Sequence, residues 1–185
     1  MMPEIALNIL DVAENSVRAG ASLIQITVCI RTEEDFLRVT IEDDGCGMDK
    51  EQTEKVQDPF FTTRKTRRVG LGIPFFKQAA ECTGGSFSIC SEKGKGTKTE
   101  AFFVLSNIDR MPLGDISGII HTLLLFNETI DFLYRYQFNE KEFTLDTREI
   151  REILGDVSFQ EPQVSSFLMD YLKENKSAVD GGVEV

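Results

Sequence analysis

The chain has 185 residues, of which 41% are hydrophobic and 28% charged, a composition typical of one globular domain or of one domain with an appendage. Its formal net charge of −11 argues against nonspecific nucleic-acid binding, which needs a basic surface. No apolar run is long enough to cross a bilayer, no signal peptide is recognisable, and the four cysteines lack paired C-x-x-C spacing, so we expect a cytoplasmic protein with no membrane association and no zinc site.

Hydrophobic periodicity divides residues 1–105 into the order helix, two strands, helix, two strands. The first helix begins at Pro3 and ends before Gly20, a common helix stop. In the second strand we expect Phe36, Val39 and Ile41 to point inward. This order predicts an α/β fold, a two-layer sandwich with helices on one face of a mixed sheet. The remaining predicted elements are strands at 23–31, 36–44, 86–92 and 97–105, a short helix at 49–57 and a helix at 73–83.

Residues 106–185 predict an acidic α+β extension that we expect to be a partner or dimer surface. They carry 7 basic and 15 acidic residues, against 13 and 16 in residues 1–105. Asp146 is the expected N-cap of a helix that ends at Gly155. The predicted elements are helices at 115–128, 146–155 and 161–175, a hairpin of strands at 130–137 and 142–145, and a frayed tail at 176–185.

The first helix carries an unexpected polar stripe. Its apolar residues spread over most of the circumference, which predicts a buried helix. Asn8, Asp11 and Asn15 nevertheless fall on one narrow stripe, at spacings of three and four residues. A carboxylate and two amides on a buried helix need polar partners. The sequence motifs downstream indicate which ligand could provide them.

Two motifs place glycines next to charged side chains. In "DDGCGMD", Asp43 ends a strand and Gly45 and Gly47 follow, so a flat ligand could approach the backbone while the carboxylate accepts a hydrogen bond from an exocyclic amine. In "VGLGIPFF", Gly70 and Gly72 precede a helix whose free amides favour an anion. Four cations lie just upstream and fit nucleotide phosphates, although a solvated loop is the better explanation of the cluster taken alone: Arg64, Lys65, Arg67 and Arg68.

A third motif, "GKGTKTEAFF", opens a strand with Thr97. Its hydroxyl could donate to a ring nitrogen or bind a bridging water, and a plain hairpin is the simpler interpretation of the motif taken alone. Each of the three motifs is weak by itself. Their order and spacing along the chain make the stronger argument.

Residues 3–105 resemble the GHKL superfamily of ATP-binding domains, which includes gyrase B, MutL, Hsp90-type chaperones and histidine kinases. "ENSVRAGAS" and "DDGCGM" are similar to the MutL motifs, whereas "DPFFTTR", "VGLG" and "GKGT" are similar to those of histidine kinases. The resemblance implies that Asn15 binds Mg²⁺, that Asp43 receives the adenine amine and that Thr97 lies beside the base. The implied ATP-binding set is completed by Gly45, Gly47, Met48, Arg64, Lys65, Gly70, Leu71 and Gly72.

Two departures from the superfamily bear on the reaction. Hydrolytic members carry a glutamate four residues before the asparagine, and here that position is Asp11, one methylene shorter, which puts hydrolysis in doubt. The only histidine, His121, lies among apolar residues without an acidic neighbour, so we expect a partly buried helix residue rather than a phospho-acceptor.

The sequence therefore predicts an Mg-ATP-binding protein and leaves three activities open. The first is a stand-alone kinase that transfers phosphate to a separate protein partner. The second is a slow MutL-like ATPase that gates association, with Asp11 as the general base. The third is a non-catalytic, nucleotide-dependent binding module. A homodimer is compatible with each of them.

Overall fold

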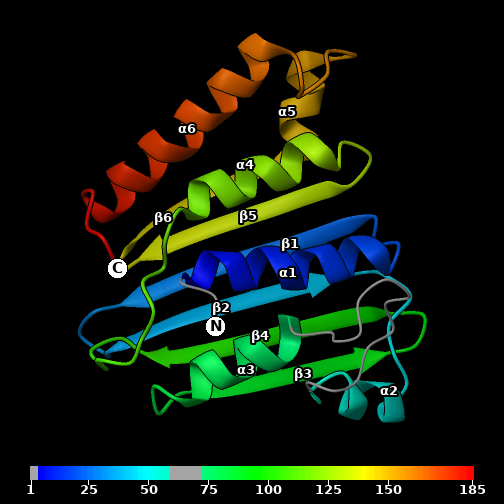
Figure 1. The fold of residues 1–185 in the computed structure, drawn as a ribbon. Helices are drawn as coiled ribbons and strands as arrows, with labels where there is room; N and C mark the ends of the chain where they lie inside the picture. The colour runs from blue at the N-terminus through cyan, green and yellow to red at the C-terminus, as the bar shows by residue number, and fades with distance from the viewer. Residues whose placement is uncertain (1–3, 59–71) are drawn as a thin grey trace.

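The computed structural model describes residues 4–58 and 72–185 as a six-stranded sheet with helices packed on it (Figure 1). Pro3, the predicted start of the first helix, lies outside these residues. The helices are α1 (Ile5–Arg18), α2 (Lys50–Lys55), α3 (Gly72–Glu81), α4 (Ile116–Phe126), α5 (Thr147–Leu154) and α6 (Pro162–Asp180). The strands are β1 (Leu23–Arg31), β2 (Phe36–Asp43), β3 (Ser86–Glu92), β4 (Gly96–Val104), β5 (Asp131–Phe138) and β6 (Lys141–Asp146).

The strands follow the order β3-β4-β2-β1-β5-β6, and all neighbours are antiparallel except β1 and β5. Side chains alternate between the two faces of a strand, and in β1 and β2 the buried residues other than Cys29 share one face. Helices α1, α3 and α4 cover that face, and the other face has no helix over it in Figure 1. The predicted two-layer α/β sandwich is therefore confirmed.

Helix α1 lies across the middle of the sheet, between α3 and α4 (Figure 1). Its apolar residues are buried in the common core, and the first-turn amides of Ile5 and Ala6 donate to the Pro112 and Leu113 carbonyls. These bonds satisfy two of the amides that a helix N-terminus leaves without an intrahelical partner. The segment between β4 and α4 thus fixes where α1 begins.

The C-terminal segment completes the same sheet. Strand β5 pairs in parallel with β1, with Leu23 opposite Asp131, and β6 forms the edge. A parallel neighbour requires a crossover, and α4 provides it, packed beside α1. Residues on both sides of position 105 consequently contribute to one hydrophobic core.

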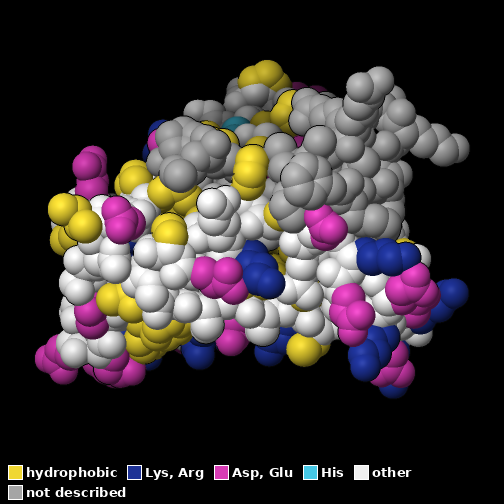
Figure 2. All heavy atoms as spheres, turned by 60° about the horizontal axis from the view of Figure 1, so that its bottom comes forward, with side chains coloured by type: hydrophobic (Ala, Val, Ile, Leu, Met, Phe, Trp, Pro, Cys, Tyr) yellow, Lys and Arg dark blue, Asp and Glu magenta, His cyan; other side chains and the backbone are white. Residues whose placement is uncertain are grey.

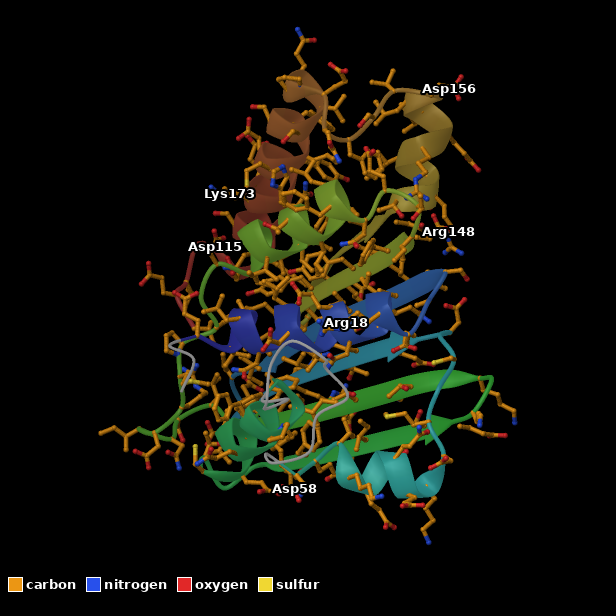
Figure 3. The ribbon with its side chains drawn as sticks, turned by 45° about the vertical axis from the view of Figure 1, so that its right-hand side comes forward. Arg18, Asp58, Asp115, Arg148, Asp156 and Lys173 are labelled. Atoms are coloured by element: carbon orange, nitrogen blue, oxygen red, sulfur yellow. The ribbon has the colours of Figure 1, made fainter. Side chains whose placement is uncertain are left out.

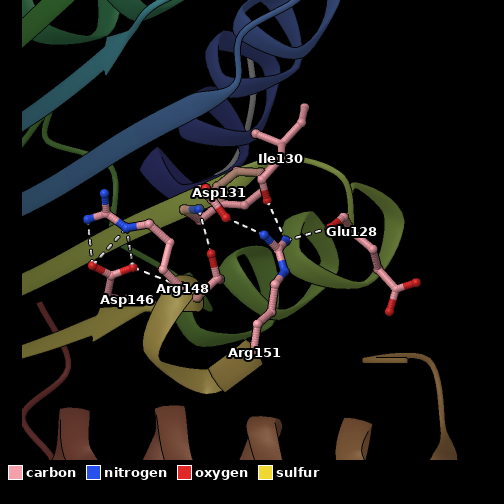
Figure 4. A network of polar contacts seen from close by, with 8 residues as sticks. Glu128, Ile130, Asp131, Asp146, Arg148 and Arg151 are labelled. Atoms are coloured by element: carbon pink, nitrogen blue, oxygen red, sulfur yellow. Dashed lines mark hydrogen bonds and ion pairs between the residues drawn. The ribbon is translucent and has the colours of Figure 1, made fainter. Parts of the chain in front are cut away.

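Arg151 attaches α5 to the start of β5 (Figure 4). Its guanidinium pairs with Asp131 and donates to the carbonyls of Glu128, at 2.5 Å, and Ile130, at 2.8 Å. The Asp146 side chain accepts from the Arg148 amide, so Asp146 is the N-cap of α5, as the sequence indicated. These contacts hold the short helix α5 against the end of the sheet.

Two local predictions were wrong. Phe36 is half-buried and pairs with the Phe102 ring, 5.1 Å between centroids, while Leu37 takes the fully buried position. Val39 and Ile41 are buried as predicted, so the error concerns Phe36 alone. Residues 176–185 are not a frayed tail. Helix α6 continues to Asp180, and the Leu113 amide donates to the Val185 carbonyl at 2.5 Å.

The reason α6 extends so far is the buried carboxylate of Asp180. It accepts hydrogen bonds from the Tyr136 hydroxyl, at 2.8 Å, from Lys176 Nζ, at 2.6 Å, and from the Gly182 amide, at 2.9 Å. Burial, helped by the hydrogen bond to Asp180, raises the pKa of the Tyr136 hydroxyl. The end of α6 is thereby fixed to β5.

We expect Asp180→Ala to lower the free energy of unfolding by about 2–3 kcal/mol, because it removes charge-assisted bonds and leaves a buried tyrosine hydroxyl unpaired. Urea denaturation followed by circular dichroism measures this. Asp170→Ala, at an exposed position of the same helix, is the matched control. Equal stabilities of the two variants would contradict the anchoring role of Asp180.

Candidate functional site

Three side chains form a row across three adjacent strands on the helix-covered face. Asp43 of β2 lies opposite Thr97 of β4, and Thr97 lies opposite Ser91 of β3. The Ser91 and Thr97 hydroxyl oxygens are 2.8 Å apart, and all three residues are half-buried. Helix α1 passes over the Asp43 end of the row. The predicted base-side residues Asp43 and Thr97 are thus brought together.

The Asp43 carboxylate is held from two sides. Ser16 of α1 donates its hydroxyl to Oδ2 at 2.5 Å, and the Gly45 amide donates to Oδ1 at 2.9 Å. Each carboxylate oxygen has two lone pairs, so both can still accept one further hydrogen bond. Asp43 is an oriented acceptor that can receive a ligand amine.

The neighbouring Asp44 has a different role. It is exposed, and it accepts hydrogen bonds from the Ser22 hydroxyl and from the amides of Ser22, at 2.7 Å, and Leu23, at 2.9 Å. These bonds, the Ser22 hydroxyl first, hold the pKa of Asp44 below its ordinary value. Asp44 therefore fixes the turn after β2 to the start of β1, which keeps Asp43 in place.

The glycines of the turn are required by close packing within the protein. A Cβ at Gly45 would lie 2.8 Å from the Ala19 Cβ. Gly47 has φ +62°, and a Cβ there would lie 2.0 Å from the Glu92 carbonyl oxygen. The turn is therefore clamped between the end of α1 and the end of β3, and it leaves little freedom for the adjacent Met48, whose amide donates to Ser91 Oγ at 2.8 Å.

The polar stripe of α1 is only partly buried. Asn8 is 1% exposed, and its amide donates weakly to the Glu4 carbonyl at 3.4 Å, whereas Asp11 and Asn15 are half-buried. Arg18 projects from the C-terminal end of α1 (Figure 3) and donates to Asn15 Oδ1 at 2.6 Å. Asn15 thus presents its amide oxygen to a cationic group, as it would to a metal ion.

Asp11 lies against the first residue of α3. A Cβ at Gly72 would be 3.1 Å from the Asp11 Cβ and 3.4 Å from its Oδ2, so only glycine gives this approach without displacing the carboxylate. The helix N-terminus favours a negative charge at that point. The predicted general base is consequently also a good structural partner for α3.

Four predicted site residues lie outside the described residues: Arg64, Lys65, Gly70 and Leu71, and with them Arg67 and Arg68. Among the described residues, no group of three or more histidine, cysteine, aspartate or glutamate side chains could hold a metal ion.

His121 does not join the site; its Nε2 lies 2.9 Å from the Ser165 carbonyl oxygen and connects α4 to α6. No described helix combines the length and hydrophobicity that a bilayer crossing requires.

Sequence reasoning missed three residues of the site: Ser16, Arg18 and Ser91. Ser16 and Arg18 lie in the motif "ENSVRAG", one and three residues after Asn15, and their helical positions give no indication of their partners. Ser91 could not be identified from the sequence either, because its contacts depend on the pairing of β3 with β4. Among the described residues on the face shown in Figure 2, acidic and basic side chains are interspersed.

The family described as histidine kinase-, DNA gyrase B- and HSP90-like ATPase matches residues 4–107. The chain belongs to this family. The matched residues include α1, the row Asp43–Thr97–Ser91 and the glycine turn after β2. The GHKL resemblance of the sequence is therefore confirmed. Residues 108–185 lie beyond the match.

The similar curated proteins are larger than this chain. The GHKL chain is 33% identical over 108 residues to the sensor protein kinase FleS of Pseudomonas aeruginosa, which covers 58% of the chain and 26% of that protein. It is 33% identical over 79 residues to the sensor histidine kinase WalK of Bacillus subtilis, covering 40% of the chain and 13% of WalK. A sensor protein of Shewanella frigidimarina is 30% identical over 107 residues, and the chain spans 16% of it.

Among solved structures, the N-terminal domain of a DNA repair protein is similar in fold. The TM-score is 0.56 at 14% sequence identity, over 78% of this chain and 52% of the other. At this identity the likeness concerns the fold alone. Its coverage shows that part of the fold similarity extends past residue 107.

The contribution of Asp44 to stability should depend on pH. Because its pKa is lowered on folding, its stabilising effect is complete at neutral pH and is lost as the pH falls through the folded-state pKa. We expect the melting temperature of the wild type to exceed that of Asp44→Asn at pH 7. That difference should shrink as the pH falls below about 3.8, the ordinary value. A difference independent of pH in thermal melts would contradict this role.

Proposed function

We propose that this GHKL domain binds ATP, with the base beside Asp43 and the phosphates toward Asn15. The observation that carries the proposal is the oriented Asp43 carboxylate, held by Ser16 and Gly45 and in register with Thr97. An acceptor next to a hydroxyl complements the amine and ring nitrogen of adenine. Family membership supports the same ligand.

The described residues also fit a magnesium ion. Mg²⁺ retains several waters and takes one or two protein oxygens together with phosphate oxygens, so the Asn15 amide oxygen is a sufficient protein donor. Arg18 uses one lone pair of the Asn15 oxygen and leaves the other. Bound Mg²⁺ would neutralise phosphate charge at this end of α1.

For the reaction, we favour phosphotransfer to a separate protein partner, which the sensor-kinase relatives support. A slow ATPase and a nucleotide-dependent binding module are the alternatives. The protein, together with the partners that co-purify with it, is incubated with γ-labelled ATP, and the label then appears on a partner, as free phosphate, or on neither. Label on a partner supports our preference, and the other two results contradict it.

We assign partner binding to residues 106–185. Every exposed large hydrophobic residue of the described chain lies in this segment, and a cluster of such residues is what an interaction surface requires. Phe167, which is 61% exposed, stacks on Tyr171 along α6. The segment is also strongly acidic, and Asp156 lies near its upper end in Figure 3. A partner with basic and apolar groups fits this surface better than a second acidic copy in a homodimer does.

We expect Asp43→Asn to weaken ATP binding roughly 10- to 150-fold, because a charge-assisted hydrogen bond is lost, worth about 1.5–3 kcal/mol. Isothermal titration calorimetry measures the affinity. Glu42→Gln, one residue earlier on the other face of β2, is the matched control and should bind as the wild type does. Wild-type affinity in Asp43→Asn, with the fold intact by circular dichroism, would remove the base assignment from this turn.

Asp11 offers a second test, on hydrolysis. If it is a shortened general base, wild-type turnover is slow, Asp11→Asn abolishes it and ATP binding persists. Asp11→Glu restores reach and should raise the rate, since a well-placed base is typically worth about 10²–10⁴-fold. A phosphate-release assay reports each rate. If Asp11→Asn turns over ATP as fast as the wild type does, Asp11 is not the general base and its role is the contact with Gly72.

A further inference from the structure

Ser91 connects the glycine turn after β2 to the threonine of the proposed base site. Its hydroxyl oxygen accepts from the Met48 amide at 2.8 Å, and its hydroxyl donates to the Gly96 carbonyl oxygen at 3.0 Å. The same hydroxyl lies 2.8 Å from Thr97 Oγ1, a contact in which either oxygen can be the donor. These three partners come from the turn and from the first two residues of β4. One side chain on the edge strand thus joins both segments that flank Asp43.

The direction of these hydrogen bonds follows from counting protons. The Met48 amide can only donate, so it occupies one acceptor site of Ser91. Ser91 has a single hydroxyl hydrogen, and its possible acceptors are the Gly96 carbonyl and Thr97 Oγ1. In the structure this hydrogen is donated to the Gly96 carbonyl, and Thr97 Oγ1 is a second acceptor within reach. When Ser91 turns its hydrogen to Thr97, the Thr97 hydrogen is free to be donated to a ligand.

We propose that Ser91 is a positioning residue that makes Thr97 a hydrogen-bond donor to the nucleobase. The chain of donors then runs from the Met48 amide to Ser91, from Ser91 to Thr97 and from Thr97 to the ligand. Successive hydrogen bonds of this kind polarise and strengthen one another. The proposal rests on the ATP-binding function proposed above and goes beyond it by assigning a role to Ser91.

The arrangement selects a particular edge of the base. Asp43 only accepts hydrogen bonds when ionised, and Thr97, served by Ser91, donates. An exocyclic amine next to an unprotonated ring nitrogen offers the complementary pattern. In adenine the amine is flanked by N1, and we infer that N1, directly or through one water, receives the Thr97 hydrogen.

Ligands lacking one nitrogen provide the decisive test. ATP, 1-deaza-ATP and 7-deaza-ATP are titrated into the wild type, Ser91→Ala and Ser91→Thr, and calorimetry gives each affinity. We expect Ser91→Ala to bind ATP roughly 5- to 30-fold more weakly, the worth of one or two hydrogen bonds. It should bind 1-deaza-ATP as the wild type does, because the bond that Ser91 supports is already absent there. Affinity for 7-deaza-ATP should fall as for ATP.

Two further substitutions of Ser91 show whether the hydroxyl group itself, and not the size of the side chain, is required. Ser91→Thr keeps the hydroxyl and should restore ATP affinity, whereas Ser91→Cys, of nearly the same size but a weak donor, should not. Ser88→Ala is the matched control, because Ser88 is on the same strand but faces the other side of the sheet. Melting temperatures show whether each variant folds.

Equal loss of affinity for all three nucleotides in Ser91→Ala would overturn the proposal, because Ser91 would then support only the packing of the turn. Wild-type ATP affinity in Ser91→Ala would overturn it as well. Failure of the wild type itself to bind ATP is a separate result, and it would refute the proposed function together with the role of Ser91.

Discussion

The hydrogen bond from Ser16 to Asp43 connects the two halves of the site. Ser16 is buried in the face of α1 that packs on the sheet, one residue after Asn15, and Asp43 ends β2. The bond therefore fixes the distance between the Asn15 amide, which we propose to bind the metal, and the Asp43 carboxylate, which we propose to receive the base. Its geometry depends in turn on the core contacts that seat α1 between α3 and α4. A shift of the helix along the sheet would separate the two groups.

The C-terminal segment is part of this support. It supplies β5 and β6 to the sheet and α4 to the helix layer, and its residues 112 and 113 receive the first amides of α1. Asp180 and the Leu113–Val185 bond fasten the far end of the same segment. Partner binding at the exposed aromatic residues of α6 would therefore act on elements that contact α1. This connection gives a physical route by which a partner and a nucleotide could influence each other.

Local patterns predicted most of the fold, because they depend on neighbours in sequence. Strand β1 has the predicted bounds, and the Asp146 cap of α5 was evident from residue type and spacing. The pairing of β5 with β1 was beyond reach, since register between distant strands leaves no local pattern. Asp43 and Thr97 were found through their motifs, whereas Ser91 became visible only once β3 was placed beside β4. The length of α6 was underestimated because Asp180 is buried through Tyr136, 44 residues away.

The central claim, that a nucleotide lies between α1 and the Asp43–Thr97–Ser91 row, is tested most directly by amide hydrogen exchange with and without Mg-ATP. The account predicts slower exchange in the second half of α1, in residues 43–48 and in residues 91–97, and unchanged exchange in β6 and the exposed face of α6. Protection confined to residues 106–185, or none under saturating ATP, would contradict it.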